Sequence, residues 1–492
     1  MDNSNFIITK AIKNIKWSAS IELATRIISP LLLIILARLL APGDFGLVST
    51  ATIAITFFQI FWDAGLSKAL VQNNELHSGA ANVVFWTNLV FSIVVYVVLF
   101  FSASAIASFF NSPGSELVIK VLGIQTIISS FGSVQQNLQV REINYKPLFI
   151  AKLLTAIVPA LISIPMALLG FGVWALIAGN MIGNLLGVGF LWFQSSWRPN
   201  LSINISILPR LLKYGIWVMF EGLLGWFINM GDNLWVGHFL GTGSLGKYQV
   251  GWSITTILFS IVLSPLLSVL FPAFSRLSND AESRTQMYWK TMKIITFLCL
   301  PMGFGLFFIG SYLELVLVNE SWAGIGAVIS WIGLLMGFSW TIGVNAELYR
   351  AIGRPDVNTK ILFICFLYYA PAYYFASQLG LNNFVIVRFL VGFLSLPIHY
   401  VLMKKILNIR LAEYIAKLKP ILLSLLIMVA VLASLVLAKN WISVEIPPIL
   451  SLIVLVLAGM GAYLGGMYLI DKQFLIDFRG LIKDVVRKES HA

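Results

Sequence analysis

Long apolar stretches separated by short polar segments repeat along nearly the whole chain. A helix needs about 20 mostly apolar residues to cross the hydrocarbon of a bilayer, so each stretch predicts one membrane span. We expect fourteen spans, at residues 17–39, 46–69, 82–110, 114–138, 148–169, 172–194, 211–239, 247–270, 288–310, 323–346, 358–378, 382–403, 420–438 and 448–470. The pattern predicts an all-α, polytopic membrane protein.

Composition supports this fold class and removes two others. Of the 492 residues, 59% are hydrophobic and 11% are charged, whereas about a quarter of the residues in soluble domains are charged. The mean hydropathy is +0.88, and 13% of the residues are aromatic. Disordered chains are poor in aromatic residues and rich in charge, so both a soluble globular fold and disorder are excluded.

Basic residues are distributed unevenly between the two sides of the predicted bundle. An even number of spans puts both termini on one side, and 27 of the 33 Lys and Arg residues fall on that side. Positive charge marks the cytoplasmic side of membrane proteins, so both termini are expected in the cytoplasm. The net charge of +12 then faces anionic lipid, and no nucleic-acid partner is expected.

Side chains that hold metals or carry out catalysis are not clustered along the chain. The four histidines are scattered, and Cys299 and Cys365 lie inside apolar runs, which does not indicate a metal site. The run from Gly241 to Lys247 is similar to a phosphate-binding loop, but Tyr248 stands where that loop needs Ser or Thr. We expect no catalytic residue, no metal and no cofactor.

The two halves of the chain match each other at a nearly fixed offset. Residues 37–46 align with 237–246 at an offset of 200, and Lys146-Pro147 aligns with Arg354-Pro355 at an offset of 208. Each half has an even number of spans, so the repeats are parallel and related by an axis along the membrane normal. We expect two pseudo-symmetric six-helix lobes, an N-lobe at 1–209 and a C-lobe at 210–410, followed by two helices and a basic cytoplasmic tail at 411–492.

Polar and ionisable side chains interrupt several apolar spans. A charge at the bilayer centre costs about 2.5–3.5 kcal/mol on insertion scales, so such residues usually face an interior cavity. Helical spacing puts them on one face of each span and predicts a hydrated cleft between the lobes. They are Ser18, Glu22, Arg26 and Ser29 in the first span, Glu221, Asn229 and Asp232 in the seventh, Gln125, Ser129, Ser133 and Gln136 in the fourth, and Asn180 and Asn184 in the sixth.

Some of these charges also have structural explanations. Glu22 and Arg26 are four residues apart and either serve transport or neutralise each other on the helix surface. Lys120 and Arg388 lie several residues inside their spans, and Arg388 interrupts an otherwise apolar helix. Among the isolated charges we therefore favour Arg388 as a functional residue.

Several short runs, taken in order, are similar to those of a known family. They are LARLLAPGDFGL at 36–47, DAGL at 63–66, GFGVWAL at 170–176, WRP at 197–199, LFPAFSRL at 270–277 and GRPD at 353–356. In the order and spacing of these runs the chain resembles the bacterial polysaccharide-export flippases of the multidrug/oligosaccharidyl-lipid/polysaccharide superfamily over residues 10–410. The resemblance implies two six-helix bundles that face each other in a V.

The resemblance also implies a substrate, an undecaprenyl-pyrophosphate-linked oligosaccharide. The substrate would move from the cytoplasmic to the periplasmic leaflet of the inner membrane for assembly of O-antigen, capsule or exopolysaccharide, by alternating access of the two lobes. Membrane lipids, a polysaccharide polymerase and chain-length machinery are the further partners that it implies. The alternative is a cation-coupled multidrug exporter of the same superfamily.

In this role the polar residues of the spans divide by their chemistry. Cations form charge-assisted hydrogen bonds with phosphate, and the pyrophosphate candidates are Arg26, Lys120 and Arg388. Amides suit sugar hydroxyls and an indole suits a sugar face, and the sugar candidates are Gln125, Asn180, Asn184, Asn229 and Trp226. Carboxylates can bind a coupling ion, and the candidates are Glu22, Glu221 and Asp232.

Overall fold

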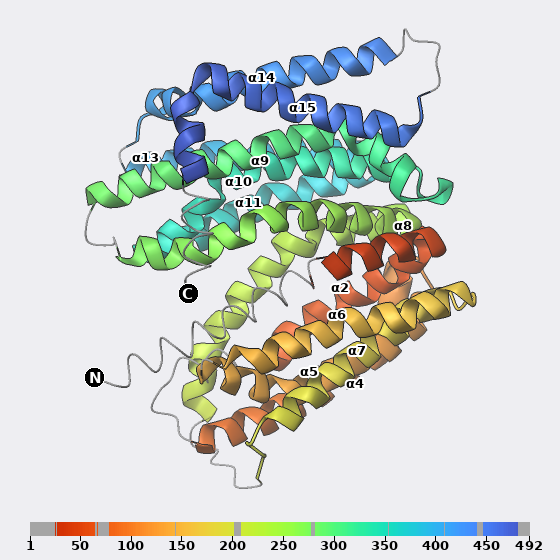
Figure 1. The fold of residues 1–492 in the computed structure, drawn as a ribbon. Helices are drawn as coiled ribbons and strands as arrows, with labels where there is room; N and C mark the ends of the chain where they lie inside the picture. The colour runs from red at the N-terminus through yellow and green to blue at the C-terminus, as the bar shows by residue number, and fades with distance from the viewer. Residues whose placement is uncertain are drawn as a thin grey trace. The chain divides into compact units, whose positions relative to one another are not determined.

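The computed structural model describes residues 25, 27–63, 66, 78–142, 144–200, 208–276, 281–352, 354–407, 409–439 and 446–480. Every regular element in these ranges is helical (Figure 1). A short apolar helix, Ile27–Leu39, comes first. The elements that follow are α2 (Pro42–Asp63), α4 (Ser78–Phe109), α5 (Ser115–Arg141), α6 (Tyr145–Leu168), α7 (Val173–Gln194), α8 (Leu208–Arg276), α9 (Ala281–Leu317), η2 (Glu320–Trp322), α10 (Ile325–Ala351), α11 (Pro355–Ser377), α12 (Leu381–Phe393), α13 (Ser395–Leu407), α14 (Leu411–Lys439) and α15 (Pro448–Ile470).

Within the described ranges, ten helices are long and apolar enough to cross a membrane. α15 begins and ends at the residues expected for the last span, and α7 differs from its expected span by one residue. α8 and α11 cover three further expected spans without being among the ten. The all-α polytopic fold is therefore confirmed, whereas the number of fourteen spans stays a prediction.

Two of the expected spans lie together in α8, which consists of two helices that meet at a kink at Gly241, whose φ of 77° and ψ of 175° are not helical. The kink lies between the expected spans 211–239 and 247–270, where the sequence predicts a turn.

α12 ends at Phe393 and α13 begins at Ser395, but Leu394 between them keeps helical backbone angles (φ −62°, ψ −17°), and Leu381–Ile406 is one of the ten apolar helices. The expected span 382–403 is therefore matched by α12 and α13 together, with Pro397 in the first turn of α13, where proline is tolerated.

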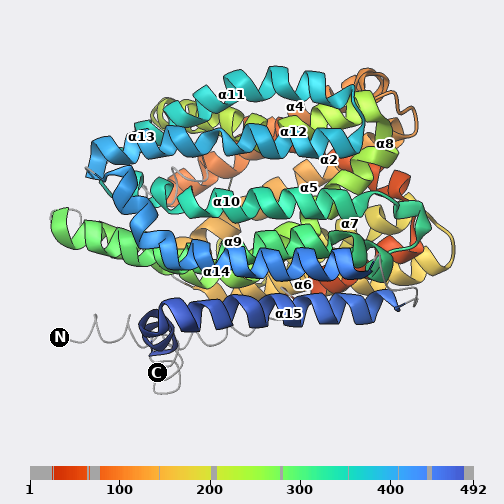
Figure 2. The same ribbon diagram turned by 90° about the horizontal axis from the view of Figure 1, so that it is seen from above.

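The chain divides into two compact units, Met1–Gln249 (unit 1) and Val250–Ala492 (unit 2). In unit 1, α4 packs against α5, α6 against α7, and α2 against α4 and α5. In unit 2, α9 packs against α10, α14 against α15, and α12 against α10 and α11 (Figure 2). Each unit has its own helical core. The lobe boundaries expected at 209/210 and 410/411 stay predictions.

Two glycines at matching positions of the repeats lie at a close helix crossing within unit 1. A Cβ on Gly46 would overlap the carbonyl group of Thr242, and a Cβ on Gly246 would overlap the carbonyl group of Pro42. Pro42 and Thr242 are themselves related by the offset of 200, so the contact is reciprocal. The start of α2 and the segment of α8 after its kink therefore meet as equivalent partners, with glycine required at both positions.

Two further glycines mark the matching starts of α7 and α12. Gly172 precedes α7 with a φ of 55°, and Gly380 precedes α12 with a φ of 86°. Glycine adopts positive φ without the steric penalty that a Cβ brings. These two residues are 208 apart, so the offset found around the prolines of α6 and α11 also relates α7 to α12.

Candidate functional site

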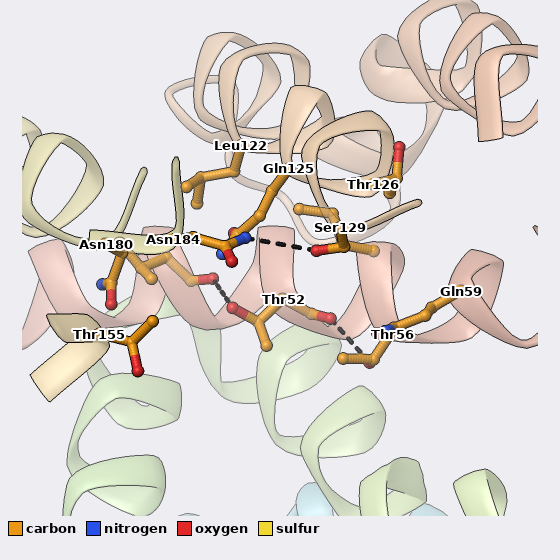
Figure 3. Close-up of a pocket in the computed structure, with 12 residues that line it drawn as sticks. Thr52, Thr56, Gln59, Leu122, Gln125, Thr126, Ser129, Thr155, Asn180 and Asn184 are labelled. Atoms are coloured by element: carbon orange, nitrogen blue, oxygen red, sulfur yellow. Dashed lines mark hydrogen bonds between the residues drawn. The ribbon is translucent and has the colours of Figure 1, made fainter. Parts of the chain in front are cut away.

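A cavity of about 490 Å³ lies among α2, α5, α6 and α7 of unit 1 (Figure 3). Its lining consists of hydroxyl, amide and aliphatic side chains: Val48, Thr52, Ile55, Thr56 and Gln59 of α2, Leu122, Gln125, Thr126 and Ser129 of α5, Thr155 of α6, and Asn180 and Asn184 of α7. We call this space the polar cavity. Its volume falls in the range of small-molecule binding sites, roughly 300–1,000 Å³.

Helical spacing explains how the polar cavity is built. Residues four apart lie one above the other on a helix, and the pairs Thr52/Thr56, Gln125/Ser129 and Asn180/Asn184 all have this spacing on α2, α5 and α7. Three helices thus each present a polar stripe to the same space. Because polar groups in a membrane bundle are costly unless they meet water or polar partners, these three stripes indicate a hydrated or ligand-filled space.

Hydrogen bonds fix part of the polar cavity wall. The Asn184 amide donates to the Ser129 hydroxyl at 3.3 Å, joining α7 to α5. The Trp226 indole of α8 donates to the Thr56 hydroxyl at 3.0 Å and packs edge-on against Phe57, with ring centroids 5.0 Å apart. Trp226 therefore holds the wall at Thr56 within unit 1.

The described residues that line the polar cavity carry no ionisable side chain. Three of the predicted sugar residues, Gln125, Asn180 and Asn184, are brought together in it. A fourth, Asn229, bonds to the Gly225 carbonyl of its own helix at 2.7 Å and is not among the lining residues. The sugar-binding role of each residue stays a prediction.

Of the three predicted cations, Lys120 and Arg388 are described by the structure, and neither is among the residues that line the polar cavity. Lys120 pairs with Glu116 at 2.6 Å, and its Nζ lies 4.9 Å from the centroid of the Phe100 ring. Arg26 and its neighbour Glu22 lie outside the described residues, as does the side chain of Glu221. Pyrophosphate binding by Lys120 and Arg26, and ion coupling by Glu22 and Glu221, stay predictions.

Arg388 lies in unit 2, buried among aromatic rings at 5% exposure. Its guanidinium carbon is 5.1 Å from the Trp252 ring centroid, 5.2 Å from that of Tyr373 and 5.9 Å from that of Tyr369. The guanidinium also donates a hydrogen bond to the Tyr373 hydroxyl. Cation–π contacts of this kind stabilise a desolvated arginine; the four side chains form what we call the arginine–aromatic cluster.

Asp232 is the predicted coupling carboxylate whose side chain the structure describes. It is 1% exposed, and it accepts hydrogen bonds from the Tyr248 hydroxyl at 2.6 Å and from the Asn233 side chain at 2.9 Å. Tyr248 lies beyond the kink in α8, so this bond ties the two parts of that helix together.

A second cavity, of about 400 Å³, lies in unit 2 and is almost entirely apolar. We call it the apolar cavity. It is lined by Leu258 of α8, Phe297, Leu298, Pro301, Met302, Gly305, Leu306 and Ile309 of α9, Met428 and Leu432 of α14, and Leu455, Val456, Gly459, Met460, Tyr463 and Leu464 of α15. The one hydroxyl among these side chains, that of Tyr463, donates to the Phe297 carbonyl at 2.9 Å.

Sequence reasoning did not single out the threonines of the polar cavity or Gln59. A signal was present, because Thr52, Thr56 and Gln59 stand at i, i+4 and i+7 on one helix face. Among the described residues, no group of three or more His, Cys, Asp or Glu is placed to hold a metal ion.

The GRPD run at 353–356 forms a local ion-pair cluster at the start of α11. Arg354 binds Asp356 at 3.0 Å, and Lys360, one turn further on, binds the same carboxylate at 3.2 Å. The hydrogen bond from Arg354, with that from Lys360, lowers the pKa of Asp356 to about 2. An acidic residue in the first turn also complements the helix dipole, so this run stabilises a helix start.

Curated relatives match most of the chain. The succinoglycan biosynthesis transport protein ExoT of Rhizobium meliloti (strain 1021) is 26% identical over 345 residues, which cover 70% of each chain. The lipopolysaccharide biosynthesis protein WzxC of Escherichia coli (strain K12) is 25% identical over 428 residues, covering 83% of this chain and 84% of the relative.

Solved structures show the same fold. Lipid II flippase MurJ, in an inward closed conformation, matches with a TM-score of 0.75 at 15% identity, covering 94% of this chain and 99% of that one. An inward-facing multidrug resistance MATE family transporter of the MOP superfamily has a TM-score of 0.62 at 16% identity, covering 78% and 94%.

The family itself is shown by sequence. The family model described as polysaccharide biosynthesis protein matches residues 35–327, which is more than half of the chain. This agrees with the family that the ordered runs predict. The chain therefore belongs to the polysaccharide biosynthesis protein family.

Proposed function

We propose that the protein is a flippase that carries a lipid-linked oligosaccharide across a membrane for polysaccharide biosynthesis. The observation that carries this proposal is the polar cavity, a space of about 490 Å³ lined by amides and hydroxyls within a bundle of membrane helices. Moving a sugar head group through hydrocarbon without hydrogen-bond partners is costly. A polar cavity supplies such partners.

The family and its named members support the same function. ExoT is named a succinoglycan biosynthesis transport protein, and TuaB of Bacillus subtilis (strain 168), 20% identical over 355 residues, is named a teichuronic acid biosynthesis protein. Their names refer to different polysaccharides. What this chain is proposed to share with them is movement of a precursor for such a polymer.

The apolar cavity suits the lipid part of the same substrate. Three of its lining residues on α15, Val456, Met460 and Leu464, are 37%, 57% and 43% exposed, which opens the cavity toward the surrounding hydrocarbon. A polyprenyl chain matches a wall of aliphatic and aromatic side chains and gains from each methylene buried there. In this proposal the lipid tail occupies the apolar cavity, and the glycan binds in the polar cavity.

The finer parts of the proposal follow from the charge distribution and the resemblance. The carrier lipid is undecaprenyl pyrophosphate, movement runs from the cytoplasmic to the periplasmic leaflet of the inner membrane by alternating access, and both termini are cytoplasmic. The protein works beside a polysaccharide polymerase and chain-length machinery. Arg26, Lys120 and Arg388 contact the pyrophosphate, and Glu22, Glu221 and Asp232 serve coupling to an ion gradient.

The multidrug exporter is the alternative that shares this fold. An exporter of cationic drugs needs acidic or strongly acceptor-rich aromatic surfaces to replace the hydration of a cation. Within the part of the chain that the structure describes, the polar cavity has no acidic lining residue. This observation favours a glycan over a cationic drug.

A leaflet-resolved transport assay tests the proposal. Purified protein in liposomes is supplied with an undecaprenyl-pyrophosphate-linked oligosaccharide, and the glycan on the far leaflet is measured with an impermeant glycosidase or lectin. We expect protein-dependent movement that falls at least about tenfold when Gln125 and Asn184 are both replaced by leucine. The matched control is Asn383→Leu on α12, whose amide bonds to the Leu379 carbonyl of its own helix.

Two results would count against the flippase. One is glycan movement equal to that in protein-free vesicles. The other is efflux of a cationic dye by the same vesicles without glycan movement, which would favour the exporter.

A further inference from the structure

The threonine hydroxyls of the polar cavity already donate hydrogen bonds to carbonyl groups of their own helices. Thr52 donates to the Val48 carbonyl at 2.8 Å and Thr56 to the Thr52 carbonyl at 2.7 Å on α2. Thr126 donates to the Gly123 carbonyl at 2.8 Å, and Thr155 donates to the Lys152 carbonyl at 2.8 Å. A hydroxyl has one proton and two lone pairs, so each of these groups keeps acceptor capacity and has no free donor.

The asparagine amides of α7 each donate one hydrogen bond as well. Asn180 donates to the Leu176 carbonyl at 2.9 Å, and Asn184 donates to the Ser129 hydroxyl. Each bond uses one of the two N–H protons of its amide, so each asparagine keeps one N–H donor and a carbonyl oxygen with two lone pairs. Acceptors therefore outnumber donors on this part of the wall.

Charge adds to this imbalance. Among the residues that the structure describes, no lysine, arginine or histidine lines the polar cavity. A phosphate or carboxylate only accepts hydrogen bonds, and a desolvated anion without a cation partner is strongly unfavourable. A neutral sugar instead offers several hydroxyl donors to the same wall.

We propose that the polar cavity binds an uncharged sugar residue through that sugar's hydroxyl donors and excludes anionic groups. The inference rests on the proposed flippase function and names the part of the substrate that this cavity takes. The pyrophosphate and any acidic sugar of the glycan then lie outside it. Gln125 and Asn184 determine this specificity, since they stand on facing helices, α5 and α7, and reach the same space (Figure 3).

A matched pair of substrates tests the inference. Liposomes that contain the full-length protein receive an undecaprenyl-pyrophosphate-linked disaccharide of two neutral hexoses, or the same lipid with the terminal hexose oxidised to a hexuronic acid. The two glycans differ by one carboxylate. We expect the neutral substrate to move at least about tenfold faster, a ratio typical of a site that leaves a buried group unpaired.

Lysine substitutions in the polar cavity test whether this cavity sets the preference for the neutral glycan. Gln125→Lys places a cation in the polar cavity and is expected to lower the neutral-to-acidic rate ratio by about tenfold. Asn184→Lys introduces the same charge from α7 and is the second variant if Gln125→Lys does not accumulate. The control is Asn383→Lys, which makes the same change in unit 2 at an amide bonded to its own helix at 3.0 Å; it should keep the native ratio.

The outcomes separate the inference from the function on which it rests. Equal rates for both glycans overturn the inference and leave the flippase in place. Movement of neither glycan overturns the proposed function, and the inference with it. A native preference for the neutral glycan that both cavity lysines leave unchanged puts the selectivity outside the polar cavity and also overturns the inference.

Discussion

The polar cavity of unit 1 and the arginine–aromatic cluster of unit 2 occupy matching positions of the two repeats. Thr52 and Trp252 are related by the offset of 200 that also relates the crossing glycines Gly46 and Gly246. Asn180 and Arg388 each lie eight residues after the positive-φ glycine that precedes α7 or α12. The same two places thus hold a small polar pair in unit 1 and a large cationic and aromatic pair in unit 2.

The difference between these regions shows what the duplication kept and what it changed. Backbone features are retained, including the glycines at the helix crossing and at the starts of α7 and α12. Side chains diverged, so that one copy of the site is open and neutral and the other is filled by a guanidinium in contact with three rings. The two units are therefore expected to contribute unequally, with glycan binding in the polar cavity of unit 1 and, in unit 2, a packed cluster whose guanidinium is the proposed pyrophosphate contact.

The largest effect is expected at the helix crossing of Gly46 and Gly246, whose offset of 200 aligns the two repeats. Gly46→Ala or Gly246→Ala places a Cβ onto a backbone carbonyl of the partner helix, and we expect a loss of about 3 kcal/mol, at the upper end for overpacked sites. The thermal stability of the purified protein measures it. Gly243→Ala is the control, because a Cβ there has no neighbour within 4 Å. Equal melting temperatures for all three variants would contradict the reciprocal crossing.

The next effect concerns the cation of unit 2. Arg388→Met keeps an apolar stem but removes the cation–π contacts and the bond to Tyr373, so we expect a loss of about 2 kcal/mol. Arg388→Lys should recover less than half of it, since an ammonium lacks the planar stacking surface of a guanidinium. Thermal unfolding and glycan transport are measured together. Native stability combined with lost transport would instead assign Arg388 to the substrate.

Hydropathy predicts the helices well where an apolar run is bounded by turn residues. α7 and α15 lie within a residue of their expected spans because the hydrocarbon thickness sets a minimum length for each run. The boundary between α12 and α13 at Leu394 lies inside an apolar run and does not interrupt the apolar helix Leu381–Ile406. Hydropathy therefore predicts one span there, and Pro397 lies in the first turn of α13, where proline is tolerated.

The candidate site was predictable in part for a similar reason. Amides such as Gln125, Asn180 and Asn184 are conspicuous in apolar helices because they need partners. Threonine satisfies its hydroxyl on the preceding turn of its own helix, as Thr52 and Thr56 do, so its presence there indicates little. The aromatic partners of Arg388 lie on α8 and α11, and periodicity within one helix does not identify contacts between helices.

Exchanging one residue between the repeats tests whether the two regions differ in function. Asn180→Arg introduces the unit 2 side chain into the polar cavity, whose described lining residues include no aromatic ring. The guanidinium should therefore compete with the sugar for the hydrogen-bond acceptors of the wall. We expect transport of a neutral glycan to fall about tenfold, equivalent to about 1.4 kcal/mol, with little change in melting temperature. Asn383→Arg is the control for added charge. Unchanged transport by Asn180→Arg would mean that the glycan does not enter this space.

The smallest effect isolates one hydrogen bond of the arginine–aromatic cluster. Tyr373→Phe keeps the ring beneath the guanidinium but removes the hydroxyl that accepts from Arg388, and we expect a loss of about 1 kcal/mol because the other contacts persist. Tyr468→Phe removes a hydroxyl from a 53% exposed side chain of α15 and should change stability by less than about 0.5 kcal/mol. If the two variants melt alike, the cluster is held by ring contacts alone, and the rigidity of unit 2 rests on Trp252 and Tyr369 rather than on this bond.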